Sequence, residues 1–322
     1  MRTRAGIFLS LLIGVFSLST SAIFASLANA SAAITAFYRL LFTSMVLFPF
    51  LILSKKNRTA LIGLSKRQWI FGLSSGLLLA IHYVLWFESL NFTSVASSTA
   101  IVTLQPLFSI LLGYLFFKER LGIFTFIGCV LSIAGCFILS WGDFQTSYRA
   151  LLGDLLALLA AAVISSYFFI GQIVRKDTPL IPYSLTGYLS SVEFLGLYAF
   201  IQQSSFTDYS ISTWRAFLGL ALISTICGQL IFNLLLKWVP ATTISMCILG
   251  EPIGTCILAY FVLHETINVQ QGAGIAIIIT GLLVFFLPAK VRVEDKNTSD
   301  GFILQRGRKS RKMKHTGGTE NG

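Results

Sequence analysis

The fold is decided by one stretch of sequence that occurs twice. Residues 94–139 read SVASSTAIVTLQPLFSILLGYLFFKERLGIFTFIGCVLSIAGCFIL, and residues 240–285 read PATTISMCILGEPIGTCILAYFVLHETINVQQGAGIAIIITGLLVF. At a constant offset of 146 residues the two copies share Pro106, Tyr114, Glu119, Gly128 and Gly135 with Pro252, Tyr260, Glu265, Gly274 and Gly281. Self-similarity at a fixed spacing, without a gap, indicates an internal duplication.

The composition around this repeat places the chain in lipid. Of its 322 residues, 55% are hydrophobic and only 11% are charged, and the mean hydropathy is +0.79. Soluble domains carry about 25% charged residues. The formal net charge of +11 does not indicate a nucleic-acid partner, because the basic residues lie in short loops and in one tail. That distribution is typical of the cytoplasmic face of a membrane protein.

The apolar segments predict an all-α membrane protein with ten transmembrane helices, since about 20 apolar residues span a bilayer. The expected helices are 7–27, 33–53, 69–90, 94–117, 124–141, 151–174, 183–202, 214–236, 243–263 and 269–287. They divide the chain into a first five-helix repeat (1–141), a linker (142–150), a second five-helix repeat (151–290) and a basic cytoplasmic tail (291–322).

Lys and Arg set the orientation of these helices. All but three of the 24 basic residues lie at the N-terminus, in the tail or in the loops on the same side, and the exceptions are Arg39, Arg149 and Arg215. The positive-inside rule therefore predicts that both termini are cytoplasmic in a multi-pass protein of the cell membrane. Because each half holds an odd number of helices, the second repeat should lie inverted relative to the first. Many secondary transporters have this design, with their site near mid-membrane.

Two terminal segments have alternative interpretations. The first apolar run, ending in Ala28-Asn29-Ala30, resembles a signal peptide. Its length, and the imbalance that cleavage would create between the halves, favour an uncleaved first helix. The tail is polar, and we expect it to be disordered. Its basic run either binds anionic lipid headgroups or is simply a solvated tail that fixes topology.

The repeated stretch resembles the drug/metabolite transporter superfamily, and within it the ten-helix transporters of the EamA type. The residues that carry the resemblance are Ser89-Leu90, Thr93-Ser94-Val95-Ala96, Gln105-Pro106, Lys118-Glu119-Arg120-Leu121 and the two glycines in the first half, their counterparts Glu251-Pro252, Glu265, Gly274 and Gly281 in the second, and Tyr38-Arg39-Leu40. The resemblance implies transport, often export, of small metabolites such as amino acids by alternating access. It names no particular substrate.

The two prolines mark the first candidate site. Proline within a helix frees a carbonyl one turn earlier, so Pro106 and Pro252 predict kinks at Val102 and Ile248. Irregular backbone at this depth is tolerated where it packs against protein or lines a cavity. The adjacent Gln105 and Glu251 either bind substrate or repair the kink by hydrogen bonding.

Charged residues within apolar segments form the second candidate set. A charge at the bilayer centre costs about 2.5–3.5 kcal/mol on insertion scales. Glu251 should therefore be protonated, paired or in contact with water, which suits proton coupling. Glu193 raises the same question on the seventh helix. Arg39 either snorkels to the interface, binds an anionic group or forms a structural ion pair.

The remaining polar faces should point inward, because lipid does not favour Gln, Asn or His. His82 and Trp86 share one face of the third helix, and Gln229 and Asn233 share one face of the eighth. These four residues either line a cavity or join helices. We read Glu119 and Glu265 as residues that fix helix ends. The recurring glycines Gly128, Gly135, Gly274 and Gly281 should permit close helix packing.

Several classes of protein lack support in the sequence. The chain carries no GxxxxGK[ST] loop, and the HExxH pattern that begins at His264 fails at Asn268. The five cysteines form no CxxC pair, so we expect no metal site and no disulfide framework. No nucleophile–base or metal cluster is recognisable, so we expect no cofactor and no enzymatic activity. The favoured function is secondary-active export of a small molecule. The alternative is a channel, or a non-transporting membrane sensor that uses its basic tail.

Overall fold

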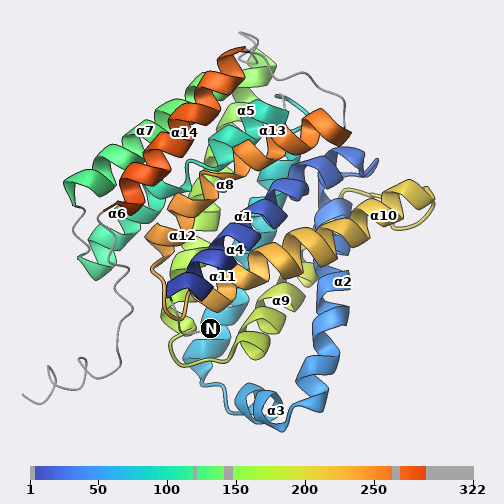
Figure 1. The fold of residues 1–322 in the computed structure, drawn as a ribbon. Coiled ribbons are helices and arrows are strands. Elements are labelled where there is room, and N and C mark those ends of the chain that lie inside the picture. The colour runs from blue at the N-terminus through green and yellow to red at the C-terminus, as the bar shows by residue number, and fades with distance from the viewer. Residues whose placement is uncertain (1–3, 94, 119–121, 141–147, 263–268, 288–322) are drawn as a thin grey trace, which may run out of the picture. The chain divides into compact units, whose positions relative to one another are not determined.

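Every regular element in the described part of the chain is a helix. The computed structural model describes residues 4–93, 95–118, 122–140, 148–262 and 269–287, which belong to one compact unit. In chain order the helices are α1 (Arg4–Leu27), α2 (Ala32–Leu53), α3 (Lys55–Ile62), α4 (Lys66–Ser89), α5 (Val95–Val102), α6 (Gln105–Phe117), α7 (Ile123–Ser140), α8 (Tyr148–Val174), α9 (Leu180–Ile201), α10 (Ile211–Gly219), the π-helix η2 (Leu220–Gln229), α11 (Leu230–Leu235), α12 (Ala241–Ile248), α13 (Glu251–Val262) and α14 (Val269–Phe286) (Figure 1).

These helices make the chain a multi-pass membrane protein. Within the described ranges, eight helical stretches are long and apolar enough to cross a membrane. The other two expected segments also lie in helices. One is the shorter apolar α7, and the other is α9, which buries polar residues such as Ser184 and Ser191 along its inner side. Residues 142–147 of the predicted linker and the basic tail lie outside the described residues, and residues 148–150 of the linker belong to α8.

Both proline-containing segments are broken helices, as the sequence predicts. The segment 94–117 divides into α5, which ends at Val102, and α6, which starts at Gln105. The segment 243–263 divides into α12, which ends at Ile248, and α13, which starts at Glu251. Each proline thus stands in the first turn of a new helix, where its missing N–H costs nothing.

The same serine hydrogen bond supports both breaks. Ser19 of α1 donates its hydroxyl to the backbone carbonyl of Glu251 at 3.0 Å, and Ser165 of α8 donates to that of Gln105, also at 3.0 Å. Ser19 and Ser165 are themselves 146 residues apart, so the bond is repeated in each half. It satisfies a backbone carbonyl at a broken helix, as membrane proteins require.

Replacing Ser165 with Ala should destabilise the α5–α6 break. Interhelical hydrogen bonds in membrane proteins contribute about 0.6 kcal/mol on average. We expect a small but measurable fall in the thermal unfolding temperature in detergent. The Ser165 hydroxyl is shared with the Ala161 carbonyl of its own helix at 2.7 Å. Ser166→Ala is therefore the matched control, because it removes only a bond within the helix, to Ala162 at 3.1 Å. Equal effects of the two substitutions would contradict the role given to Ser165.

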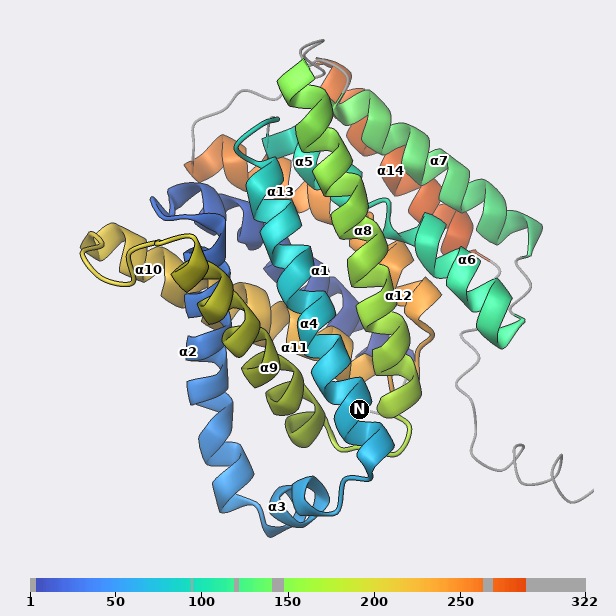
Figure 2. The same cartoon turned by 180° about the vertical axis from the view of Figure 1, so that it is seen from behind.

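The α7–α14 pair is held by its glycines. The two helices lie side by side in both views (Figures 1 and 2). A Cβ added to Gly128 would meet the Gly281 carbonyl at 2.6 Å, and one added to Gly274 would meet the Leu139 backbone N at 2.6 Å. Gly135 similarly faces the backbone N of Ile278 at 2.7 Å. The recurring glycines therefore lie at a backbone-to-backbone contact, which small residues allow.

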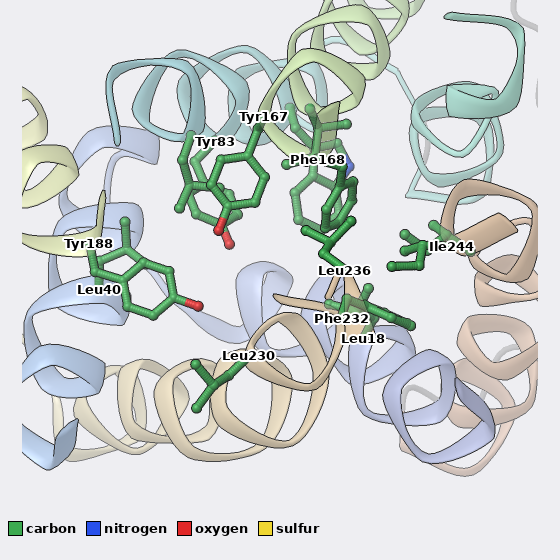
Figure 3. Packing of buried hydrophobic residues seen from close by; sticks show 14 of the residues in the cluster. Leu18, Leu40, Tyr83, Tyr167, Phe168, Tyr188, Leu230, Phe232, Leu236 and Ile244 are labelled. Carbon is green, nitrogen blue, oxygen red and sulfur yellow. The ribbon is translucent and has the colours of Figure 1, made fainter. Parts of the chain in front are cut away.

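The other helices pack around a common core. Figure 2 shows α4 between α8 and α9, and α4 packs against both of them. On the opposite side α1 packs against η2 and α13, while α2 packs against α9. The core includes wholly buried aromatic residues from several of these helices, among them Tyr83, Tyr167, Tyr188 and Phe232 (Figure 3).

Candidate functional site

A small cavity lies where the broken helices meet the core. It has a volume of about 30 Å³. Its walls come from α1, α2, α4, α5, α6, α8, η2, α12 and α13, through the side chains of Leu18, Ser21, Arg39, His82, Tyr83, Trp86, Val102, Gln105, Ile164, Phe168, Gln229, Ile248 and Glu251. A cavity needs about 10–15 Å³ of such space to hold one water molecule, so this one has room for a few waters and is too small for a metabolite.

The cavity brings together six residues that the sequence singled out. His82 and Trp86 come from successive turns of α4, and Gln105 and Glu251 stand at the starts of α6 and α13. The helix breaks thus place the polar residue before each proline at the cavity wall. The other two of the six are Arg39 and Gln229, which stands at the end of the π-helix.

Arg39 is the most constrained of these side chains. It is 1% exposed. Its Nε donates to Thr225 Oγ1 at 2.8 Å, and its Nη1 donates to Ser21 Oγ at 2.6 Å. The guanidinium also lies 4.4 Å from the centre of the Tyr83 ring, a cation–π contact. Arg39 of α2 therefore ties together α1, α4 and η2.

The π-helix supplies one of the partners of Arg39. Thr225 donates its hydroxyl to the carbonyl of Leu220, five residues earlier, while its oxygen accepts from Arg39. π-helical turns often mark functional sites. The sequence pattern predicted a regular helix over 214–236 and gave no sign of this segment.

Arg39 and Glu251 place opposite charges at one cavity. Glu251 is buried at 5% exposure, and the Arg39 guanidinium interacts with it electrostatically. Burial of a carboxyl group is costly unless a charge or hydrogen-bond donor faces it. The pair therefore gives the cavity an acidic wall on α13 and a basic wall on α2.

His82, which lines the cavity, contributes a hydrogen-bond acceptor. Its Nδ1 lies 3.0 Å from the carbonyl oxygen of Ala160. Because a carbonyl only accepts, Nδ1 carries the proton and Nε2 of the neutral ring is left as an acceptor. The ring lies nearly parallel to that of Trp86, at 17° with centroids 6.0 Å apart.

Four polar atoms at the cavity wall lack a hydrogen-bond partner among the described residues. They are Tyr83 OH, Trp86 Nε1, Gln105 Oε1 and Gln229 Nε2. An unsatisfied buried polar group costs about 1–3 kcal/mol. Such groups are rare in native structures, and several that converge on one cavity indicate a place where a polar molecule pairs with them.

Other candidates do not reach the cavity. Asn233 is fully buried one turn beyond Gln229, but its amide bonds to Tyr167 and Tyr188 instead. Glu193 is exposed on α9, so the structure does not bring it to the site. Glu119 and Glu265 lie outside the described residues.

The structure adds residues that the sequence did not single out. Tyr83 and Thr225 both contact Arg39. Thr225 precedes Gln229 by four residues, so a search for polar residues at helical spacing would have found it. Tyr83 gave no such signal, because tyrosine is common in apolar cores.

Comparison with known proteins identifies the family. The model of the EamA-like transporter family matches the chain twice, over residues 4–141 and 151–287. The chain belongs to this family. Among curated relatives of this EamA-like transporter is an uncharacterized transporter of Methanothermobacter thermautotrophicus, 27% identical over 211 residues, which are 64% of this chain and 61% of that protein. Another is the uncharacterized transporter YxxF of Bacillus subtilis, 26% identical over 220 residues, with 68% and 70% covered.

A solved structure supports the fold. One crystal structure of a protein superimposes on this EamA-like transporter with a TM-score of 0.72. The match covers 91% of this chain and 100% of that one, at 18% sequence identity. At this identity the likeness shows a shared fold and nothing further. The matched region spans 61% of the length of the archaeal relative. The match therefore does not extend the activity of that whole protein to this chain.

Proposed function

We propose that this membrane transporter is a secondary-active exporter of small metabolites that works by alternating access. The observation that carries the proposal is the cavity between the two halves, with Arg39, Glu251 and four unpaired polar atoms at its wall. A transporter needs a site that is reachable from each side in turn. In this structure the site is too small for a metabolite, so binding requires that the helices around it move.

Reciprocal helix packing supports two inverted repeats. The offset of 146 residues pairs α1 with α8, and α4 with the helix that contains η2. Accordingly, α8 of the second half packs on α4 of the first, as α1 of the first half packs on η2 of the second. At the α7–α14 contact, Gly128 faces Gly281, which is the partner of Gly135, as a two-fold relation requires. We infer that the protein lies in the cell membrane, crosses it ten times and has both termini in the cytoplasm.

The polar groups favour a small zwitterion as the substrate class. Tyr83 OH, Trp86 Nε1 and Gln229 Nε2 offer donors that, together with the Arg39 guanidinium, suit a carboxylate. Glu251, Gln105 Oε1 and His82 Nε2 offer acceptors, which suit an ammonium group. An amino acid carries both groups within a few ångströms. Its ammonium and a proton would compete for the Glu251 carboxylate, which provides a route to proton coupling.

A transport assay tests this function. The full chain is reconstituted in proteoliposomes loaded with a panel of amino acids and related metabolites, with and without a pH gradient. We expect saturable efflux of at least one zwitterion, faster when the gradient drives protons inward. If folded protein moves none of the panel under either condition, the proposed function is wrong.

A further inference from the structure

A second buried polar cluster lies outside the cavity. Asn233 of α11 donates its amide to Tyr167 OH of α8 at 2.7 Å and to Tyr188 OH of α9 at 3.3 Å. All three side chains are at most 1% exposed. In Figure 3 the hydroxyl groups of Tyr167 and Tyr188 are turned toward the same region of the core. The cluster therefore joins three helices that follow one another in the second half of the chain.

Arg175 fastens this cluster from the turn that follows α8. Its Nε donates to the backbone carbonyl of Asn233 at 2.9 Å, and its Nη1 donates to the carbonyl of Thr178 in the same turn. The side chain is 2% exposed. Burial lowers the pKa of the Arg175 guanidinium to about 10, which leaves it charged at neutral pH. A buried arginine that is held by backbone carbonyls resists displacement, because those carbonyls would otherwise lose their partner.

The cluster extends from the level of the cavity toward the α8–α9 turn. On α8, Tyr167 lies between Ile164 and Phe168, which line the cavity, and Arg175 lies about two turns beyond Phe168. In the eighth membrane segment Gln229 lines the cavity and Asn233 follows one turn later. Asn233 and Arg175 therefore stand on the side of the cavity that is nearer the α8–α9 turn.

The equivalent positions in the first half carry different groups. The repeat partners of Tyr167, Tyr188 and Asn233 are Ser21, Phe42 and Phe87. Phe87 stacks on Tyr83 with centroids 5.7 Å apart and contacts Trp86 at 4.9 Å. The hydrogen-bonded cluster of the second half therefore has an aromatic counterpart in the first half, and the two should respond to different substitutions.

The polar cluster also contains an atom that favours its opening. Asn233 Oδ1 is buried and has no partner within the described residues. Water that enters when the helices separate would pair with this atom. A transporter populates both closed and open states, so a group that water satisfies on opening suits a gate.

We propose that Tyr167, Tyr188 and Asn233 form the gate of the transport path at the α8–α9 end, and that Arg175 is its latch. This proposal rests on the proposed function, because a gate implies a path. It assigns these four residues to opening and closing, and leaves substrate binding to the cavity.

Accessibility of the cavity tests the gate without measuring transport. Ile164→Cys places a reporter thiol at the cavity wall, in a full-length chain whose five native cysteines are replaced by alanine. A membrane-impermeant maleimide is applied to vesicles of each orientation. We expect Arg175→Met to speed labelling about tenfold from the α8–α9 side, the change that 1.4 kcal/mol produces, and to leave labelling from the other side unchanged.

Two further variants keep the result decisive. Lys176→Met removes a positive charge from the same turn, at an exposed residue, and should label at the parent rate. Tyr167→Phe deletes one gate bond without changing a charge, and decides the question if Arg175→Met fails to fold. Unchanged labelling in both gate variants, or equal acceleration from both sides, would overturn the gate. Altered labelling in a protein that moves no metabolite would leave the gate standing and refute the transport function instead.

Discussion

Replacing Glu251 with Gln is expected to lower metabolite flux about a hundredfold or more while the protein remains folded. Glu251 supplies the negative wall of the cavity opposite Arg39. Truncating one partner of a buried charge pair at a binding interface costs about 2–5 kcal/mol, which sets the scale for a contact between Glu251 and the ammonium group of a substrate. Glutamine keeps the size of the side chain but carries neither the charge for an ammonium group nor a site for a coupling proton. Flux into or out of proteoliposomes measures the loss.

Glu193→Gln is the matched control. It makes the same chemical change in another membrane segment, at an exposed residue of α9. Its flux should equal that of the parent. Gel filtration and thermal unfolding report whether each variant is folded. If Glu251→Gln fails to fold whereas Glu251→Asp folds and transports, the charge is structural as well. Parent-level flux in Glu251→Gln would contradict the role of this residue.

Replacing Gly128 with Leu should prevent the α7–α14 pair from forming. A Cβ at this position would lie 2.6 Å from the Gly281 carbonyl and from the Phe285 backbone N. These are backbone atoms of a helix, so they cannot rotate away as a side chain would. Overpacking a core costs about 1–3 kcal/mol, and occasionally more. We expect the upper end of this range and a large loss of folded protein on gel filtration.

Gly272→Leu is the control, because it makes the same replacement of glycine by leucine at an open position. Gly272 lies on α14 as well, but no heavy atom stands within 4 Å of its hypothetical Cβ. Leucine also has a higher helix propensity than glycine. The variant should therefore be at least as stable as the parent. If both substitutions reduce folded protein equally, close backbone packing at Gly128 is not the cause.

Local rules explain why the helix breaks were predictable. Proline removes a backbone donor, so the duplicated Pro106 and Pro252 indicate where α5 and α12 end. The duplication is part of this signal, because Pro49 lies inside the continuous helix α2. The duplicated spacing likewise placed Gln105 and Glu251 in equivalent positions. These features follow from the identity and spacing of residues along the sequence, so they can be predicted without knowing any tertiary contact.

Helical periodicity was less reliable for the cavity wall. Gln229 and Asn233 share a face at a spacing of four residues, yet only Gln229 lines the cavity. Asn233 instead donates its amide to Tyr167 and Tyr188, away from the cavity. A shared face therefore did not imply a shared site. Glu193 shows the same limit, because α9 buries serines and leaves this glutamate exposed.

Two elements escaped the hydropathy pattern for different reasons. The helix α3 has eight residues and is rich in basic side chains, so a search for apolar segments passes over it. Its N-cap, Ser54, accepts from the backbone N of Asn57 at 3.4 Å and was the available signal. The π-helix depends on tertiary bonds such as Arg39 to Thr225, which no local pattern reveals.

The most direct test of alternating access about the Glu251 cavity is a counterflow measurement. Proteoliposomes that contain the full chain are loaded with a high concentration of an unlabelled amino acid and diluted into a trace of the labelled one. We predict that label accumulates transiently above its equilibrium level, and that Glu251→Gln abolishes this overshoot while Glu193→Gln preserves it. Label that only equilibrates, at a rate proportional to its concentration in all three proteins, would show a channel and contradict a carrier with its site at Glu251.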